Sequence, residues 1–266
     1  MFTKMGQMLS IDHQDGDGKT SLSRAIIKEC SFRNERSPHY SKWSVHTDEL
    51  LLEGANPNIP DNTGFTPLVY ACNYGCLDVV NNLLSKGADP NETALRITFQ
   101  SHLKFSGKIL KRLLIDYKGK VDPNILQPTS LCSNPRTYKK LKLLLPRGAD
   151  PNVSDGVHRT PLYWASRNQR IKSVKLLLLH GANPNMVDGS GGSPLRWAFY
   201  HNDPIMIREL LLYGANANTL GLVNGDNLEI VEELKDYFPS LQILSTRSMR
   251  KHRVNITKIP PEIYPS

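Results

Sequence analysis

Residues 160–185 read TPLYWASRNQRIKSVKLLLLHGANPN and carry the start and stop signals of two short helices. Thr160 precedes Pro161, a pair typical of a helix start, because the hydroxyl caps the first turn and proline loses no hydrogen bond at the first helical position. In the corresponding stretch 77–84, apolar residues recur at spacings of three and four, which indicates a helix with one buried face. Gly181 supplies the left-handed conformation that often ends a helix. The stretch therefore predicts two helices joined by a turn.

The same unit recurs along the chain. It ends in Leu-Leu-x-x-Gly-Ala-Asn/Asp-Pro-Asn or a close variant, and successive copies are 33, 33, 28, 33 and 33 residues apart, at Asn58, Asn91, Asn124, Asn152, Asn185 and Asn218. The helix-start signal recurs at Thr66, Thr160 and Ser193, with degenerate copies at Thr20, Thr93 and Thr129. A single unit cannot bury its own apolar face, so the units must stack.

This pattern resembles the ankyrin repeat, whose period is 33 residues and whose signature includes Thr-Pro-Leu-His-x-Ala. The resemblance implies an all-α solenoid of about six helix-turn-helix repeats with projecting β-hairpin fingers, such as those at Asp61–Gly64 and Asp155–His158. We expect an N-terminal extension over residues 1–11, the repeat array over 12–237 and a basic tail over 238–266. A closing helix is expected at 226–235.

The array is expected to be irregular between residues 92 and 140. Eight residues separate Asn58 from Thr66, but only two separate Asn91 from Thr93, so the third repeat lacks its finger. The fourth repeat is the one of 28 residues. A polar insertion at 31–47 lengthens the first repeat.

Composition excludes several classes of protein. Lysine and arginine number 33 against 25 acidic residues, a net charge of +8 that is spread along the chain, so nucleic-acid binding is not expected. No apolar run is long enough for a transmembrane helix, and the first residues lack the hydrophobic segment of a signal peptide. The four cysteines are therefore expected to be reduced thiols in a cytoplasmic protein, with the nucleus as the alternative location. We expect a monomer.

Motifs that suggest chemistry have structural explanations. Gly18-Lys19-Thr20 lacks the earlier glycine and the strand of a nucleotide-binding loop, and it falls in register with the finger that contains Gly64. Cys72 and Cys76 have no second pair with which to hold zinc, so packed thiols are favoured. No catalytic constellation is present. The sequence therefore predicts a protein that is not an enzyme and takes no cofactor or metal.

In ankyrin repeats, the concave groove is lined by the finger tips and the exposed side of the first helix. Carried over position by position, this implies a protein-binding groove at Tyr70, Asn73, Tyr74, Trp164, Arg167, Asn168, Trp197, Tyr200 and His201. Tryptophan, tyrosine and arginine are enriched at binding hot spots. The alternative for each ring is packing between neighbouring helices.

The tail from Ser240 resembles the start of a suppressor-of-cytokine-signalling (SOCS) box, Ser-Leu-x-x-Leu-Cys-Arg-x-x-Ile-Arg followed by Leu-Pro-x-Pro. The resemblance implies docking to elongins and a cullin through Leu241, Leu244, Met249, Arg250, Ile259 and Pro260. The chain departs from the pattern at Ser245, Thr246 and Glu262. The alternative is a solvated basic tail that directs the chain to the nucleus or contacts nucleic acid.

Two functions follow from these patterns. The first is a module that binds a protein through the groove and serves as the substrate-recognition part of a cullin–RING ubiquitin ligase. The second is an ankyrin scaffold or regulatory protein with no link to a ligase, which a basic tail takes to the nucleus.

Overall fold

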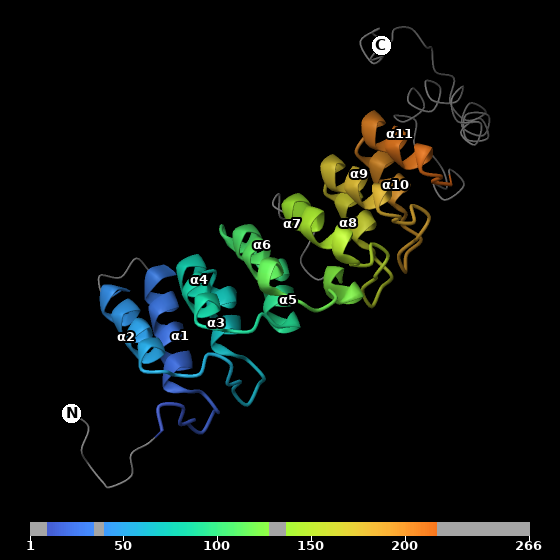
Figure 1. Cartoon of the computed structure of the whole chain (residues 1–266). Helices are drawn as coiled ribbons and strands as arrows, with labels where there is room; N and C mark the ends of the chain where they lie inside the picture. Colours follow the sequence, from blue (N-terminus) through green and yellow to red (C-terminus); the bar gives the residue numbers. More distant parts are fainter. Residues whose placement is uncertain (1–9, 35–39, 128–136, 217–266) are drawn as a thin grey trace, which may run out of the picture. The chain divides into compact units, whose positions relative to one another are not determined.

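The structure of the chain is a computed structural model that describes residues 10–34, 40–127 and 137–216 (Figure 1). It divides into two compact units, Met1–Ile125 with Lys142–Ala149, and Leu126–Leu141 with Asp150–Ser266. The α-helices of the described residues are α1 (Ser21–Asn34), α2 (Tyr40–Leu52), α3 (Pro67–Tyr74), α4 (Leu77–Ser85), α5 (Glu92–Gln100), α6 (Ser106–Asp116), α7 (Thr137–Leu144), α8 (Pro161–Arg167), α9 (Ile171–Leu179), α10 (Pro194–Tyr200) and α11 (Pro204–Leu212). Two short 3-10 helices cover Pro123–Leu126 and Leu145–Arg147.

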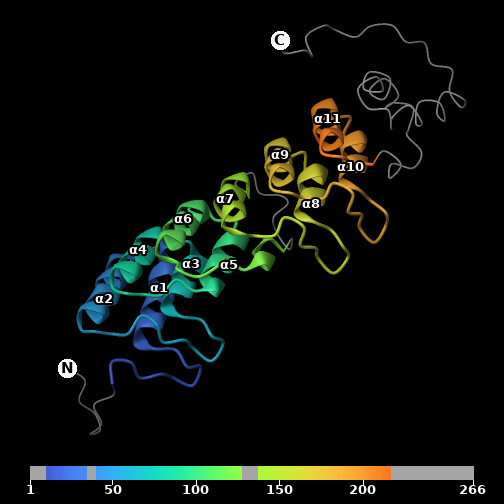
Figure 2. The ribbon, with the colours of Figure 1, turned by 45° about the vertical axis from the view of Figure 1, so that its right-hand side comes forward.

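Within each unit, the helices form pairs that stack in two rows. In the second unit, α8 packs against its repeat partner α9 and against α10, while α9 packs against α11. Figure 2 shows these two rows side by side. In the first unit, α3 contacts α1 and α5, and α4 contacts α6. The all-α repeat fold expected from the sequence is confirmed in the described residues.

The predicted helix starts are confirmed. The side chains of Thr66, Thr160 and Ser193 each accept a hydrogen bond from the backbone N–H three residues later, and proline follows each of them. The predicted stops are also confirmed, because Gly87 and Gly181 have φ of 84° and 85°, in the left-handed region. The pairs α3–α4 and α8–α9 are therefore defined at both ends by local chemistry.

In the described residues, the side chains of Asn58, Asn152 and Asn185 each join one repeat to the next. Asn152 donates from Nδ2 to the carbonyl of Gly181 at 3.1 Å, and its Oδ1 accepts from the backbone N–H of Asn183 at 2.7 Å. Asn185 makes the same two bonds to Gly214 and Asn216. This explains why asparagine recurs in the repeat, since its amide can donate and accept at once.

The core lies between the two rows of helices and is built from the apolar stripes that the spacing predicted. Val80 and Leu83 of α4 are fully buried, as are Leu177 of α9 and Leu210 of α11. Burying such a side chain contributes about 1.5–3 kcal/mol to folding. Because each stripe packs against the adjacent repeat, this gain depends on stacking.

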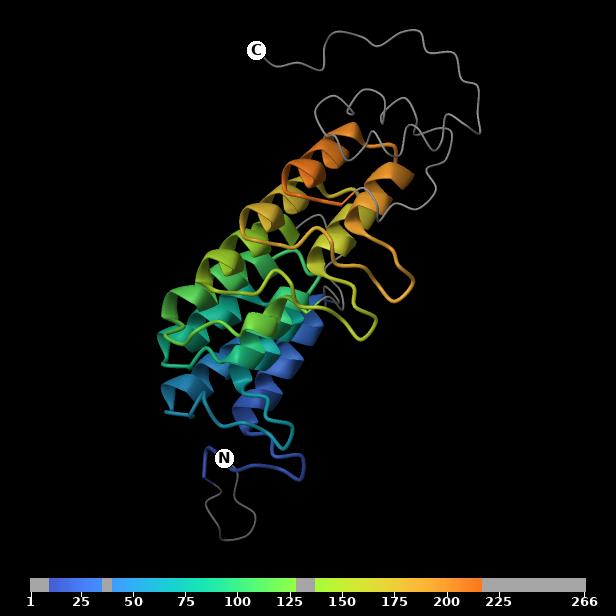
Figure 3. The same ribbon diagram turned by 90° about the vertical axis from the view of Figure 1, so that its right-hand side faces the viewer.

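The fingers project from the repeats as turns rather than as strands. Figure 3 shows the loops before α8 and α10 extending from the same side of the second unit. In the first of them, Asp155 Oδ1 accepts from the backbone N–H groups of Val157 and Arg159 at 3.0 Å. The expected β-hairpins are reduced in the described residues to one isolated bridge, Gln14 with Thr20. In the finger before α8, the backbone bond that joins its two sides runs from the N–H of Asp155 to the carbonyl of Arg159 at 3.1 Å, at the turn itself.

The expected irregularities have clear structural forms. Asn91 caps α5 directly, accepting from the N–H of Ala94 at 2.9 Å, so no finger precedes this helix. The insertion in the first repeat is taken up by the longer helices α1 and α2, which end and begin at Asn34 and Tyr40. The predicted closing helix at 226–235 and the tail at 238–266 lie outside the described residues.

The sites that the sequence analysis rejected are structural in the described residues. Asp15 closes the first finger as Asp155 closes a later one, accepting from the N–H groups of Asp17 and Lys19 at 2.9 Å. Cys72 is buried, and this burial raises the pKa of its thiol to about 12. No group of three potential metal ligands occurs among the described residues. No helix within them has the length and apolar character to cross a bilayer.

Replacing Asn152 with alanine tests the repeat-to-repeat bonds. Asn152→Ala removes one donor and one acceptor, so we expect the free energy of unfolding to fall by about 1–2 kcal/mol. Asn81→Ala is the control, because Asn81 is exposed on α4 and alanine has a higher helix propensity. Urea unfolding followed by circular dichroism measures both. Equal stability of the two variants would contradict the assignment.

Candidate functional site

Two tryptophans of the second unit stand at the same position of consecutive repeats. Trp164 lies in α8 and Trp197 in α10, each four residues after the residue that caps its helix. The two helices are neighbours, and both indole rings are half-buried. Stacking of the repeats therefore brings the two rings into one cluster.

Arginine side chains lie against both indoles. The Arg167 guanidinium is 5.1 Å from the centre of the Trp164 ring and 5.2 Å from that of Trp197. Arg159, in the finger before α8, lies 4.5 Å from the Trp164 ring and forms an ion pair with Asp155 at 2.8 Å. An exposed contact of this kind contributes about 0.5–1 kcal/mol.

Aromatic rings extend the cluster. The buried Tyr163 meets both Trp164 and Trp197 edge to face, at 5.6 and 5.9 Å between ring centres. Tyr200, which is 73% exposed, meets Trp197 edge to face at 5.6 Å. His201 stacks on Trp197 at 6.2 Å. We call Arg159, Trp164, Arg167, Trp197, Tyr200 and His201 the tryptophan–arginine surface.

A side chain of the next repeat holds the backbone at Arg167 in place. His201 Nε2 lies 2.7 Å from the carbonyl oxygen of Arg167, and Gln169 Nε2 lies 2.9 Å from His201 Nδ1. A carbonyl can only accept and an amide nitrogen can only donate, so these contacts place the imidazole proton on Nε2. Asn168 Nδ2 donates to the carbonyl of Trp164 at 3.0 Å. The end of α8 is thus held to α10.

Gln169 adopts a backbone conformation that costs energy. Its φ is 55°, in the left-handed region, where the corresponding residue of the second repeat is Gly75 with φ 73°. A side chain other than glycine is uncommon there and is destabilised by about 1 kcal/mol. At this position the amide of Gln169 reaches His201. The strained backbone of Gln169 therefore carries the side chain that contacts His201.

The carboxylates next to this surface are already engaged. Burial opposes ionisation of Asp188, but hydrogen bonds from Ser190, Gly192 and Tyr163 lower its pKa to about 2. Asp155 is similar, because bonds from its own turn outweigh burial and lower its pKa. Arg167 makes no ion pair within the part of the chain that the structure describes. The surface therefore presents one cation without a carboxylate.

The three residues that the sequence placed in the second repeat are not members of this cluster. Tyr70, Asn73 and Tyr74 lie at or near the exposed side of α3, in the first unit. The Tyr70 hydroxyl donates to Asp61 of its own finger. Burial and this bond raise the pKa of Tyr70. Its hydroxyl therefore has a structural role in the finger.

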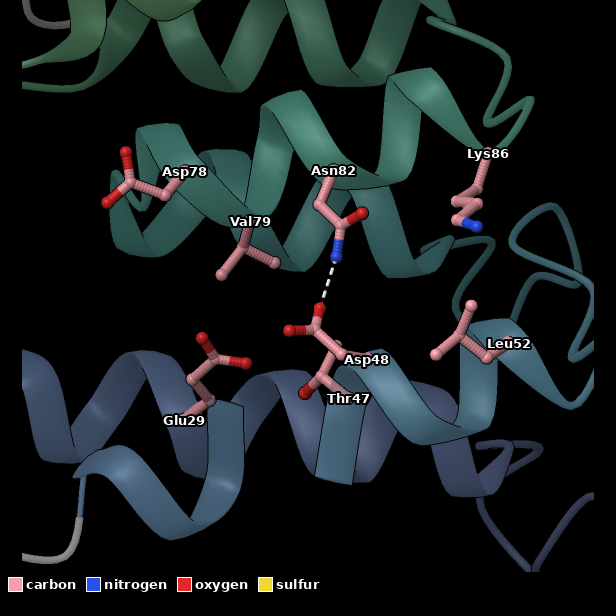
Figure 4. A pocket seen from close by; sticks show the side chains of 8 residues that line it. All are labelled: Glu29, Thr47, Asp48, Leu52, Asp78, Val79, Asn82 and Lys86. Carbon is pink, nitrogen blue, oxygen red and sulfur yellow. Dashed lines mark hydrogen bonds between the residues drawn. The ribbon is translucent and has the colours of Figure 1, made fainter. Parts of the chain in front are cut away.

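A cleft in the first unit was not anticipated from the sequence. It has a volume of about 440 Å³ and is lined by α1, α2 and α4. Figure 4 shows Asp48 and Asn82 facing one another across it, with the Asn82 amide donating to Asp48. Glu29 and Asp78 also line it. These carboxylates come from three helices, so no spacing in the sequence reveals them.

Three residues of the second unit's cluster were also missed. Only exposed positions of the first helix were assigned to the groove. Arg159 precedes this helix, Tyr163 is buried in it and Gln169 follows it, so none of the three was assigned. The sequence does contain a signal for Gln169. It aligns with Gly75, so a glutamine stands where another repeat has the glycine that ends a helix.

Comparison with known proteins identifies the family. A family model described as ankyrin repeats, in three copies, matches residues 7–94 and 129–220. These segments are more than half of the chain, and the chain belongs to the ankyrin-repeat family. Ankyrin repeats are protein–protein interaction modules, and the fold is typically a non-enzymatic binding scaffold.

Curated relatives match about half of the chain. It is 33% identical over 130 residues to the transient receptor potential channel pyrexia of Drosophila melanogaster, covering 46% of this chain and 14% of that protein. It is 30% identical over 132 residues to the ankyrin repeat and KH domain-containing protein mask-1 of Caenorhabditis elegans, covering 46% of this chain and 5% of that protein. The match therefore spans a small part of either relative.

Solved structures agree on the fold. The ankyrin repeat domain of Bcl-3, described as a unique member of the IkappaB protein family, is 26% identical with a TM-score of 0.57, covering 81% of this chain and 99% of that one. The ankyrin repeat domain of human ASB11 is 22% identical with a TM-score of 0.54, covering 86% and 98%. At that identity the likeness to ASB11 shows the fold alone.

Two substitutions of Gln169 separate its backbone strain from its side-chain contact. Gln169→Gly and Gln169→Ala both lose the amide that reaches His201, but only glycine relieves the left-handed conformation. We expect Gln169→Gly to be more stable than Gln169→Ala by about 1 kcal/mol in urea unfolding. Equal stabilities would show that the conformation carries no strain.

Acid should weaken the second unit through Asp188. Its folded pKa of about 2 lies below its ordinary value of 3.8, so its contribution is fully present above about pH 4. That contribution is lost as the pH falls toward 2. We expect Asp188→Asn to unfold more easily at pH 7 and to lose less stability than the unchanged chain over this range. Thermal unfolding at stepped pH measures the effect, and parallel curves would contradict it.

Proposed function

We propose that this chain recruits another protein through the tryptophan–arginine surface. The observation that carries the proposal is the sharing of Arg167 between Trp164 and Trp197, beside the exposed ring of Tyr200. Aromatic and arginine side chains supply most of the binding energy in many interfaces. The surface is held in place by contacts between repeats, so little order must be gained on binding.

We further propose that the recruited protein is the substrate of a cullin–RING ubiquitin ligase in the cytoplasm. The support is the resemblance of the tail from Ser240 to the start of a SOCS box, in which Leu241, Leu244, Met249, Arg250, Ile259 and Pro260 would dock elongins and a cullin. In this arrangement the repeats select the substrate and the tail brings the ligase.

The second candidate is an ankyrin scaffold or regulatory protein without a ligase. The support is the cluster of basic residues in the tail, Arg247, Arg250, Lys251, His252 and Arg253. Such a cluster is typical of a nuclear-localisation signal. This candidate keeps the same binding surface and differs only in what the tail does.

Affinity purification with quantitative mass spectrometry tests both parts, using the full chain as bait. Tyr200→Ala should lower the recovery of the recruited protein, because it removes the most exposed ring of the surface. Leu244→Asp should remove elongins and the cullin but leave the recruited protein. Retention of elongins by Leu244→Asp, or their absence from the unchanged chain, would exclude the ligase role.

Leu212→Ala is the matched control for the surface. Leu212 is 59% exposed on α11, so its truncation also removes an exposed apolar side chain from the second unit. Recovery should be unchanged in this variant. If this chain accumulates in the nucleus, and replacing the basic cluster abolishes that accumulation, the result would instead favour the scaffold without a ligase.

A further inference from the structure

The charge state of the surface indicates what it binds. Arg159 is neutralised by Asp155, and Asp188 is held by its own turn and by Tyr163. Arg167 is exposed and forms no ion pair among the described residues. The one uncompensated cation of the surface is therefore the guanidinium placed between two indoles.

We propose that the tryptophan–arginine surface binds an acidic linear segment of a partner protein, with a carboxylate on Arg167 and a neighbouring apolar side chain on Tyr200. This inference rests on the proposed function, since it names the chemistry of the partner that the surface recruits.

The geometry favours a carboxylate. A guanidinium stacks through its faces, and its N–H groups lie in its plane, where they can pair with both oxygens of a carboxylate. The two indoles already restrict the position of Arg167, and His201 holds its carbonyl at 2.7 Å. Less side-chain entropy is then lost when the carboxylate binds.

The same contacts disfavour a nucleic acid. Base stacking along a strand needs several free aromatic faces, but Trp164 has Arg159 and Arg167 over its ring at 4.5 and 5.1 Å, and Trp197 has Arg167 and His201. Tyr200 is then the one exposed ring of the surface. Binding to a phosphate backbone requires several cations. Arg159 of this surface is already paired with Asp155, which leaves Arg167 as its one cation without an ion pair among the described residues.

A phage library of random linear peptides, selected on the folded full chain, tests the proposal. We expect enriched peptides to carry aspartate or glutamate next to an apolar residue. Arg167→Gln should weaken a selected peptide about tenfold, which is typical of a lost charge-assisted hydrogen bond. Arg208→Gln is the matched control, because Arg208 is an exposed arginine on α11.

A double-mutant cycle identifies the partner of Arg167. The selected peptide and its neutral version, with glutamine or asparagine at the acidic position, are titrated into the unchanged chain and Arg167→Gln. If the carboxylate sits on Arg167, the two changes are non-additive, and the neutral peptide binds both proteins with nearly equal affinity. Additive losses would overturn the proposal.

The remaining outcomes are distinct. Enriched peptides that lose affinity with Tyr200→Ala but contain no acidic residue would overturn the acidic partner and leave the proposed surface standing. No enrichment on the folded chain would overturn the linear segment, and the effect of Tyr200→Ala in the affinity purification would then decide the proposed surface by itself. A single-stranded oligonucleotide that displaces the peptide and is itself weakened by Arg167→Gln would replace the acidic segment with a nucleic acid.

Discussion

The side-chain amides of Asn58, Asn152 and Asn185 each tie a repeat to the next, and they hold neighbouring repeats in register in both units. Asn152 and Asn185 bond to the loop one repeat on, at distances between 2.7 and 3.1 Å. No repeat can bury its own leucine stripe, so the apolar gain is realised only when neighbours are in register. The amide sets that register because it donates to one backbone group and accepts from another.

The same register creates the candidate site. Residues one repeat apart become neighbours in space, which is how Trp164 and Trp197 come to share Arg167. His201, one repeat beyond Asn168, then reaches back to the carbonyl of Arg167. The surface is thus a consequence of stacking and is ordered before any partner arrives. Gln169 contributes to this order at the cost of a left-handed backbone.

Periodicity predicted the helices, their caps and the shared face of the two tryptophans, because each depends on residues close in sequence or one repeat apart. Periodicity did not predict which of the arginines form ion pairs. Among the described residues Arg159 is paired and Arg167 is not, which depends on side-chain packing around Asp155 and the indoles. The cleft of the first unit could not be predicted for a similar reason, since its carboxylates lie on three different helices. The fingers were predicted as hairpins because turn residues mark where the chain reverses but do not show how far backbone pairing extends from the turn.

The most direct test of the binding surface uses the three tryptophans as probes. The chain contains Trp43, Trp164 and Trp197, so labelling with 15N-tryptophan gives one indole signal for each in an NMR spectrum. Titration with the recruited protein should shift the signals of Trp164 and Trp197 and leave that of Trp43, in α2, unchanged. Binding that shifts only Trp43, or none of the three, would contradict the assignment of the surface.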